Sequence, residues 1–333
     1  MKILGIETSC DETSVALVKN MSGILRVDKN LVYSQIKIHQ KFGGVVPEVA
    51  ARRHVEKIVP LIKQALKEKP DAIAVTAGPG LATALLVGAE TAKTLSYFLK
   101  IPLIRINHLE GHIYANFLNK KIKETKNIFP ALCLIISGGH TELILMQDHL
   151  RYKLIGQTKD DAVGECFDKV GKILGLSYPG GPEVAKLAAK GNCQAFVFPR
   201  PMLESQDFNF SFSGLKTAVL YHIQKNSSNI PDVCASFQQA ALDVLINKTL
   251  RAAQKYRVKT ILTGGGVAAN KELQKQLISA IKKRAPQIKY SPISPKFCGD
   301  NAAMIASAGY FNAQKKKFTY LKKLKINPEW ELV

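Results

Sequence analysis

Two segments of the sequence share one pattern, in which an apolar strand, a short turn of small polar residues and a second strand follow one another. The first covers residues 3–18 around a turn at 8–13, and the second covers residues 131–146 around a turn at 137–141. Each pattern is typical of a β-hairpin. Because one hairpin begins each half of the chain, the sequence predicts a duplicated α/β architecture with a cleft between two domains.

Glycine-rich turns follow two further apolar runs. Residues 71–76 are followed by Ala-Gly-Pro-Gly at 77–80 and then by helical periodicity through 81–99. Residues 260–262 lead into glycines 264–266 before an alanine- and lysine-rich helix. Glycine has no Cβ atom, so such turns bring backbone N–H groups close to a phosphate. Two such turns facing one cleft would hold a nucleotide from both sides. The alternative is that they are tight turns without a ligand.

The polar stretch 119–127 (NKKIKETKN) separates the two halves. It has neither helix nor strand periodicity, so we place the domain boundary there, between an N-terminal domain 1–127 and a C-terminal domain 128–333. A length of 333 residues exceeds what one hydrophobic core usually supports, which also favours two domains.

The charge balance is strongly basic. The chain has 47 Lys and Arg against 26 Asp and Glu, a formal net charge of +21. This surplus favours a polyanionic partner such as nucleic acid. A lysine-rich surface without a partner is the alternative. Candidate contacts are Arg52, Arg53, the lysines of 120–126 and residues 282–284.

The spacing of the cysteines and the hydropathy of the chain argue against several classes of protein. The six cysteines are scattered without a CxxC pair, which argues against a zinc ribbon and a disulfide framework and fits a reducing cytoplasm. No run reaches the roughly 18 apolar residues that a membrane helix needs, and the first residues lack the apolar stretch of a secretory signal. We therefore expect a cytoplasmic protein without a membrane partner.

Tests against nucleotide-binding motifs are mostly negative. GxxxxGK[ST] is absent, which argues against a P-loop enzyme. Residues 264–269 fit GxGxxA after a strand, but 276–295 contain no acidic residue for a ribose. A basic residue at 282–284 could serve NADP, so a Rossmann dehydrogenase is disfavoured rather than excluded.

His108 and His112 lie one helical turn apart, a spacing at which two imidazoles can share one metal ion. Glu110 is about 200° around the helix from His108, so the pattern is not that of an HExxH zinc protease. Such a pair is more often structural, and it becomes a metal site only if a third ligand joins it.

Ten segments in register over nearly the whole chain resemble the universal tRNA N6-adenosine threonylcarbamoyltransferase family, the bacterial TsaD or Gcp type, related to the catalytic subunit of the KEOPS complex. The segments are 5–17, 42–54, 76–88, 107–115, 134–144, 160–176, 178–188, 208–219, 263–270 and 298–306. The resemblance implies an actin-like ATPase (ASKHA) fold of two RNase H-like domains around a central cleft. It also implies that the segment from about 299 returns to the N-terminal half.

The resemblance implies an acyltransferase. Its donor would be threonylcarbamoyl-AMP, and its acceptor would be N6 of the adenosine on the 3′ side of the anticodon in tRNAs that read codons beginning with A. The product would be N6-threonylcarbamoyladenosine. An ATP-dependent sugar or acetate kinase-like phosphotransferase on the same fold is the alternative, and a non-catalytic tRNA-binding scaffold is another.

The resemblance also implies site residues. It places metal ligands at His108, His112 and Asp300, with iron(II) as the expected ion and zinc as the alternative, and an acidic catalytic position at Glu12. The implied adenylate-binding positions are Ile136, Ser137, Gly138, Gly139, His140, Asp168, Gly181 and Asn270.

Several of the implied site residues also have a purely structural alternative. Asp300 precedes an apolar helix start and could cap it, and Asp168 could pair with Lys169 or Lys172 on the surface. The chain departs from the family at Ala185, where many members have an acidic residue. A ribose contact from that side chain is absent here.

The resemblance implies two protein partners besides tRNA and the adenylate. One is a smaller paralogous TsaB-like subunit that pairs with the N-terminal domain. The other is a TsaE-like ATPase that binds the resulting complex.

Overall fold

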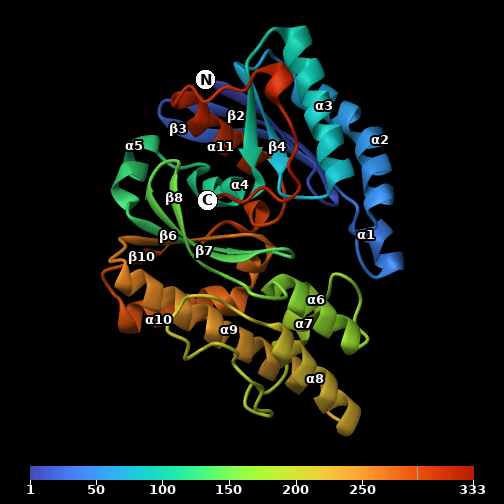
Figure 1. Ribbon diagram of the computed structural model, residues 1–333, viewed down its shortest axis with the longest axis vertical. Helices are drawn as coiled ribbons and strands as arrows, with labels where there is room; N and C mark the ends of the chain where they lie inside the picture. Colours follow the sequence, from blue (N-terminus) through green and yellow to red (C-terminus); the bar gives the residue numbers. More distant parts are fainter. Residues whose placement is uncertain (291) are drawn as a thin grey trace. The chain divides into compact units, whose positions relative to one another are not determined.

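The computed structural model describes residues 1–290 and 292–333, which divide into two compact α/β units (Figure 1). The first unit contains Met1–Ile128, Asp148–Arg151 and Pro295–Val333, and the second contains Phe129–Gln147 and Tyr152–Ser294. Among the described residues, no helix is both long and apolar enough to cross a lipid bilayer.

The first unit is built on a sheet in the order β3-β2-β1-β4-β5. The first hairpin of the sequence is present, because β1 and β2 pair antiparallel, while β1, β4 and β5 are parallel. The strands are β1 (Lys2–Glu7), β2 (Glu12–Met21), β3 (Ile24–Ser34), β4 (Ala72–Gly78) and β5 (Leu103–Asn107).

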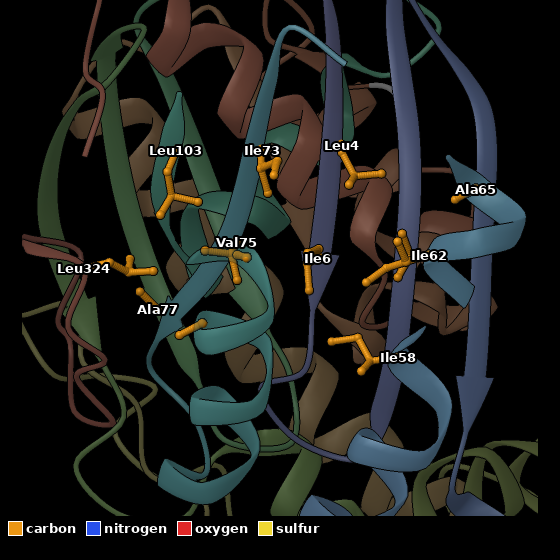
Figure 2. Close-up of a cluster of buried hydrophobic side chains, with 13 residues drawn as sticks. Leu4, Ile6, Ile58, Ile62, Ala65, Ile73, Val75, Ala77, Leu103 and Leu324 are labelled. Atoms are coloured by element: carbon orange, nitrogen blue, oxygen red, sulfur yellow. The ribbon is translucent and has the colours of Figure 1, made fainter. Parts of the chain in front are cut away.

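Side chains alternate across this sheet and separate its helices into two layers. Leu4 and Ile6 of β1 join a buried cluster with Ile58 of α2, as Figure 2 shows. Gly5, between them, faces α11 on the opposite side. The helices of this unit are α1 (Ile36–His39), α2 (Pro47–Ala65), α3 (Ala82–Leu99), α4 (His108–Tyr114), α5 (Ile122–Thr125) and α11 (Ala302–Gln314).

The second unit contains a sheet in the order β10-β9-β6-β7-β8. The second hairpin is present in the antiparallel pair β6 and β7, and β9 pairs parallel to β6. The strands are β6 (Ala131–Ile136), β7 (Thr141–Asp148), β8 (Arg151–Gln157), β9 (Thr260–Gly264) and β10 (Lys289–Tyr290). The helices are α6 (Val163–Ile173), α7 (Gly180–Ala188), α8 (Ser213–Lys225), α9 (Ile230–Lys255) and α10 (Lys271–Arg284).

The polar stretch 119–127 is more ordered than its sequence pattern predicts. It contains the one-turn helix α5, and its backbone bonds to the turn between β2 and β3 and to the start of β3. Asn119 N–H donates to Leu25 O at 2.7 Å, and Ile122 N–H donates to Gly23 O at 2.8 Å. The expectation of no regular structure was wrong because these long-range bonds leave no trace in local periodicity.

His149, in the tip between β7 and β8, packs against α4 and α11. Its ring stacks on Phe311 of α11 with 4.3 Å between centroids, and its Nδ1 lies 3.2 Å from the hydroxyl of Tyr114 in α4. Its Nε2 lies 3.0 Å from the hydroxyl of Thr125. Burial lowers the pKa of His149 to about 4, with smaller effects from nearby charges.

We expect His149 to make the first unit sensitive to acid. Its pKa in the folded chain lies below the unfolded value of 6.5, so the unfolded chain binds more protons between these limits. The stabilisation is fully present above pH 6.5 and is lost as the pH falls towards 4. Allowing for the partial exposure of the ring, the loss is about 1–2 kcal/mol.

Urea unfolding of the parent and of His149→Gln at pH 7.5 and pH 4.5 tests this expectation. The variant should lose less stability than the parent between the two pH values, and His222→Gln on α8 is the control. Equal losses in the parent and in His149→Gln would contradict it.

Candidate metal centre

Helix α4 places two imidazoles side by side. It starts directly after β5, and the side chain of Asn107 caps it by accepting a hydrogen bond from Leu109 N–H at 2.8 Å. His108 and His112 are both buried, with 4.6 Å between ring centroids. The helix and the spacing predicted from HxxxH are therefore confirmed.

Asp300 joins the two histidines from the other end of the chain. Its Oδ1 lies 3.4 Å from Nε2 of His108 and 3.4 Å from Nε2 of His112. The alternative role of Asp300, as a cap of the following helix, is not what the structure shows, because Asn301 is the cap and accepts from Met304 N–H at 3.2 Å. With Asn301 as the cap, the Asp300 carboxylate faces the histidines.

The three side chains fit a divalent cation. Both ring nitrogens of His112 are buried without a hydrogen-bond partner among residues 1–290 and 292–333, so a contact of 3.4 Å does not satisfy Nε2. Ligand atoms bound at about 2.1 Å from one ion lie roughly 3.0–3.4 Å apart. The ligand atoms of His108, His112 and Asp300 lie within 4.8 Å of one another. Two imidazoles and one carboxylate match the ligand set of iron(II) or zinc.

Without a bound ion, the pKa values of the two histidines are shifted in opposite directions. Burial lowers the pKa of His112, which favours the neutral ligand form. Burial also lowers the pKa of His108, but the negative charges of Asp300 and Glu7 outweigh it and raise that pKa well above its usual value. A bound cation would take the place of this proton.

Glu7, at the end of β1, fixes the orientation of His108. Its Oε2 lies 3.1 Å from His108 Nδ1 and accepts a hydrogen bond from the hydroxyl of Thr76 at 2.6 Å. Its Oε1 accepts from Ser9 N–H at 2.5 Å, and its side chain is fully buried. A buried carboxylate accepts hydrogen bonds, so Nδ1 carries the proton and Nε2 presents its lone pair. Sequence reasoning missed Glu7, although an acidic residue ending an apolar strand was a visible signal.

Glu12 lies at the start of β2. Its Oε1 accepts a hydrogen bond from the hydroxyl of Ser34 at 3.2 Å. Burial, followed by the negative charges of Asp300 and Asp11, raises the pKa of Glu12 well above its usual value.

In the second unit, two internal hydrogen bonds hold the turn after β6, and the turn leaves space beside its two glycines. Ser137 N–H donates to His140 O at 2.9 Å, and His140 N–H donates to Ser137 Oγ at 3.1 Å. No atom lies within 4 Å of where a Cβ would be at Gly138 or Gly139 among the described residues. This turn stands at the carboxyl end of β6, where α/β sheets commonly bind ligands.

Close backbone packing brings the other glycine loops to the same edge of the sheet. A Cβ at Gly265 would lie 2.3 Å from Ile136 O, and one at Gly164 would lie 2.4 Å from Ser137 O. Gly265 also has a φ of +92°, a conformation that favours glycine. These glycines are therefore needed for packing whether or not a nucleotide binds.

Asp168 and Gly181 contact each other directly. Gly181 N–H donates to Asp168 Oδ1 at 2.9 Å, which joins α6 to α7. Lys169 forms its ion pairs with Asp161 and Glu165.

Asn270 is engaged within the protein. Its Oδ1 caps α10 by accepting from Leu273 N–H at 3.0 Å, and its Nδ2 donates to Gln238 at 2.8 Å. Any contact between Asn270 and an adenylate would compete with these bonds.

Comparisons with known proteins point to one family. A family model described as TsaD, tRNA N6-adenosine threonylcarbamoyltransferase, matches residues 26–307. A protein of that name from Caldicellulosiruptor saccharolyticus is 48% identical, over 95% of this chain and 94% of its own. One from Staphylococcus carnosus is 50% identical, over 93% of this chain and 90% of its own.

Solved structures share the fold at low identity. HypF from T. kodakarensis superposes with a TM-score of 0.63 at 14% identity over 98% of this chain, which spans 49% of that protein. A ROK family protein from Streptococcus pneumoniae in complex with sucrose gives a TM-score of 0.56 at 12% identity, over 95% of this chain and 100% of its own. These likenesses confirm the predicted α/β fold of the actin-like ATPase class.

Proposed function

The chain belongs to the tRNA N6-adenosine threonylcarbamoyltransferase family, and we propose that it performs this reaction with the two groups of residues described above. It transfers a threonylcarbamoyl group from threonylcarbamoyl-AMP to N6 of the adenosine on the 3′ side of the anticodon, in tRNAs that read codons beginning with A. The likeness to relatives over nearly the whole chain carries this conclusion. The kinase alternative is not favoured, because phosphoryl transfer to a sugar has no use for the His–His–Asp group.

We assign His108, His112 and Asp300 as the ligands of one divalent metal, iron with zinc as the alternative. The buried nitrogens of His112, for which the described part of the chain offers no hydrogen-bond partner, support this assignment. Two nitrogens and one oxygen leave coordination positions open. A metal held there supplies Lewis-acid character or orients the donor.

The reaction needs positioning more than activation. The mixed anhydride already has a good leaving group, whereas the adenosine amine is a poor nucleophile because its lone pair is delocalised into the ring. Holding the two together contributes several kcal/mol. As the N6–carbonyl bond forms and AMP leaves, the amine loses a proton. The carboxylate of Glu12 is our candidate acceptor for it.

The donor's adenylate belongs, in this proposal, to the second unit. Backbone N–H groups at Gly138 and Gly139 would hold the phosphate, and the open space beside both glycines supports this role. The further proposed contacts are Ile136, Ser137, His140, Asp168, Gly181 and Asn270. We therefore assign the metal to an N-terminal RNase H-like domain (1–127, with the segment from about 299) and the adenylate to a C-terminal one (128–333).

The proposed reaction also implies binding partners. The substrates tRNA and threonylcarbamoyl-AMP follow from the reaction. Val55 and Val59 of α2 and Leu86 of α3 are exposed large apolar residues, which supports a surface for a TsaB-like subunit on these helices. We also propose a TsaE-like ATPase that binds the resulting pair, and a cytoplasmic location, where tRNA substrates are found.

We expect Glu7→Gln to weaken metal binding about 10- to 100-fold, because the loss of the carboxylate charge makes His108 a weaker ligand. The exchange keeps the shape of the side chain, so the fold should persist. Competition with a chromophoric chelator measures the dissociation constant of iron(II) or zinc, and Glu90→Gln on the exposed side of α3 is the control. An unchanged dissociation constant in Glu7→Gln would show that the carboxylate does not tune the ligand.

One reconstituted assay tests the function. The full chain is incubated with labelled threonine, bicarbonate, ATP, unmodified tRNA and the companion enzymes, and the tRNA is digested to nucleosides. Label in N6-threonylcarbamoyladenosine supports the proposal. ATP-dependent phosphorylation of a sugar or acetate without labelled nucleoside would replace it with the kinase alternative.

A further inference from the structure

A hollow of about 860 Å³ opens on the first unit, between the end of α3 and the segment that follows α11. Its walls are fixed by backbone and side-chain bonds. Thr319 N–H donates to Leu103 O at 2.7 Å, which attaches the C-terminal segment to the edge strand β5. On the other wall, Ser96 donates from its hydroxyl to Ile101 O at 2.6 Å. The hollow is therefore part of the folded unit.

Aromatic rings on the walls are exposed to an unusual degree. The side chains of Tyr97, Phe98 and Tyr320 are 77%, 80% and 76% exposed, and Phe318 beside them is 45% exposed. Single exposed apolar residues are ordinary on a protein surface, but a group around one hollow marks an interaction site.

Positive charge is interleaved with the rings. Residues 315–325 (KKKFTYLKKLK) contain no acidic residue, and Lys100 lines the opposite wall. Lys323 Nζ lies 5.7 Å from the ring centroid of Tyr320. The exposed lysines of the segment are Lys315, Lys316, Lys317, Lys322, Lys323 and Lys325.

These lysines are available for an outside partner. Within residues 1–290 and 292–333, no ion pair involves Lys100 or the lysines of 315–325. By contrast, the tRNA-contact candidates Arg52 and Arg53 are paired with Glu48 and Glu56. Lys100 and the lysines of 315–325 therefore place positive charge beside the aromatic hollow that no carboxylate of the described residues neutralises, although other lysines of the first unit are also outside ion pairs.

We propose that this hollow binds unpaired nucleotides of the RNA substrate, at a site separate from the metal centre. Exposed bases of single-stranded loops and ends stack on aromatic rings, and lysines beside the rings neutralise the adjoining phosphates. Its volume lies within the range of about 300–1,000 Å³ typical of small-ligand pockets. The inference rests on the proposed function, because it takes the RNA to be tRNA.

Two combined variants distinguish the contribution of base stacking to RNA binding from the contribution of the lysine charges. Tyr97→Ala with Tyr320→Ala removes two exposed rings, and Lys316→Gln with Lys322→Gln and Lys323→Gln removes three charges. Tyr221→Ala with Lys225→Gln, an exposed aromatic–lysine pair on α8, is the matched control. Fluorescence anisotropy measures the affinity of the full chain for a labelled, unmodified tRNA transcript between 50 and 250 mM salt.

The aromatic variant should bind tRNA about 10- to 30-fold more weakly with an unchanged salt slope, since each stacked base contributes substantially to affinity. The lysine variant should lower the salt slope by about two, because each phosphate that a lysine neutralises contributes slightly less than one unit to it. The control should bind within twofold of the parent. A fully paired RNA duplex of equal length should bind the parent and the aromatic variant alike.

Unchanged tRNA affinity in the aromatic variant would overturn the proposal. Two other results would also overturn it. In both, the aromatic variant keeps its tRNA affinity, but it no longer binds anionic phospholipid vesicles or no longer self-associates in sedimentation. The test is independent of catalysis. At saturating tRNA the aromatic variant should still form the modified nucleoside, whereas failure of the parent to form it counts against the proposed function alone.

Discussion

Replacing Asp300 with alanine should strip the metal from the protein and lower the rate of threonylcarbamoyl transfer by at least about a hundredfold. The two histidines remain on α4, but a pair of imidazoles without the carboxylate offers too few ligands to hold an ion. His108→Ala and His112→Ala should have the same effect. Elemental analysis of each purified variant, together with its single-turnover transfer rate, measures both effects.

Asn301→Ala is the matched control for Asp300→Ala. It removes the helix cap next to the ligand, so it should cost about 1 kcal/mol of stability while the metal stays bound. Full metal occupancy in Asp300→Ala would remove Asp300 from the ligand set. Full activity of the metal-free parent would exclude a catalytic role for the ion.

Gly5→Ala should destabilise the first unit by about 2–3 kcal/mol. A Cβ at Gly5 would lie 2.1 Å from Ala302 O and 2.9 Å from Ala306 N, so α11 would have to move away from β1. Because Asp300 immediately precedes α11, the same shift should move its carboxylate from the histidines and weaken metal binding.

Denaturant unfolding and metal titration test both consequences of Gly5→Ala. Gly44→Ala is the control, because nothing within the described residues lies within 4 Å of its added Cβ. It should change stability by less than about 0.5 kcal/mol. An unfolding midpoint for Gly5→Ala equal to that of the parent would show that α11 adapts without cost.

Local patterns in the sequence were sufficient for the hairpins and for the helix that carries His108 and His112. Apolar alternation and the spacing of four residues are properties of neighbouring positions. Asp300 could not be found in this way, because only the returning chain brings it to α4, and it was expected solely from the family resemblance. The three-ligand group therefore depended on a likeness spread over the whole chain.

The points that local sequence patterns left open or missed have a common physical cause. Asp300 and Asn301 are both good helix caps, and the backbone conformation that selects Asn301 is set by the packing of α11. Glu7 was overlooked because its role depends on Thr76 and His108, which are distant in sequence. The stretch 119–127 was expected to lack regular structure, since its bonds to the β2–β3 turn involve residues about a hundred positions away.

The most direct test of the account is mass spectrometry of tRNA nucleosides from cells depleted of this protein and supplied with the parent or with His112→Ala. We expect N6-threonylcarbamoyladenosine to disappear on depletion, to return with the parent, and to stay absent with His112→Ala expressed at the same level. Undiminished N6-threonylcarbamoyladenosine in the depleted cells, or its full return with His112→Ala, would contradict the account.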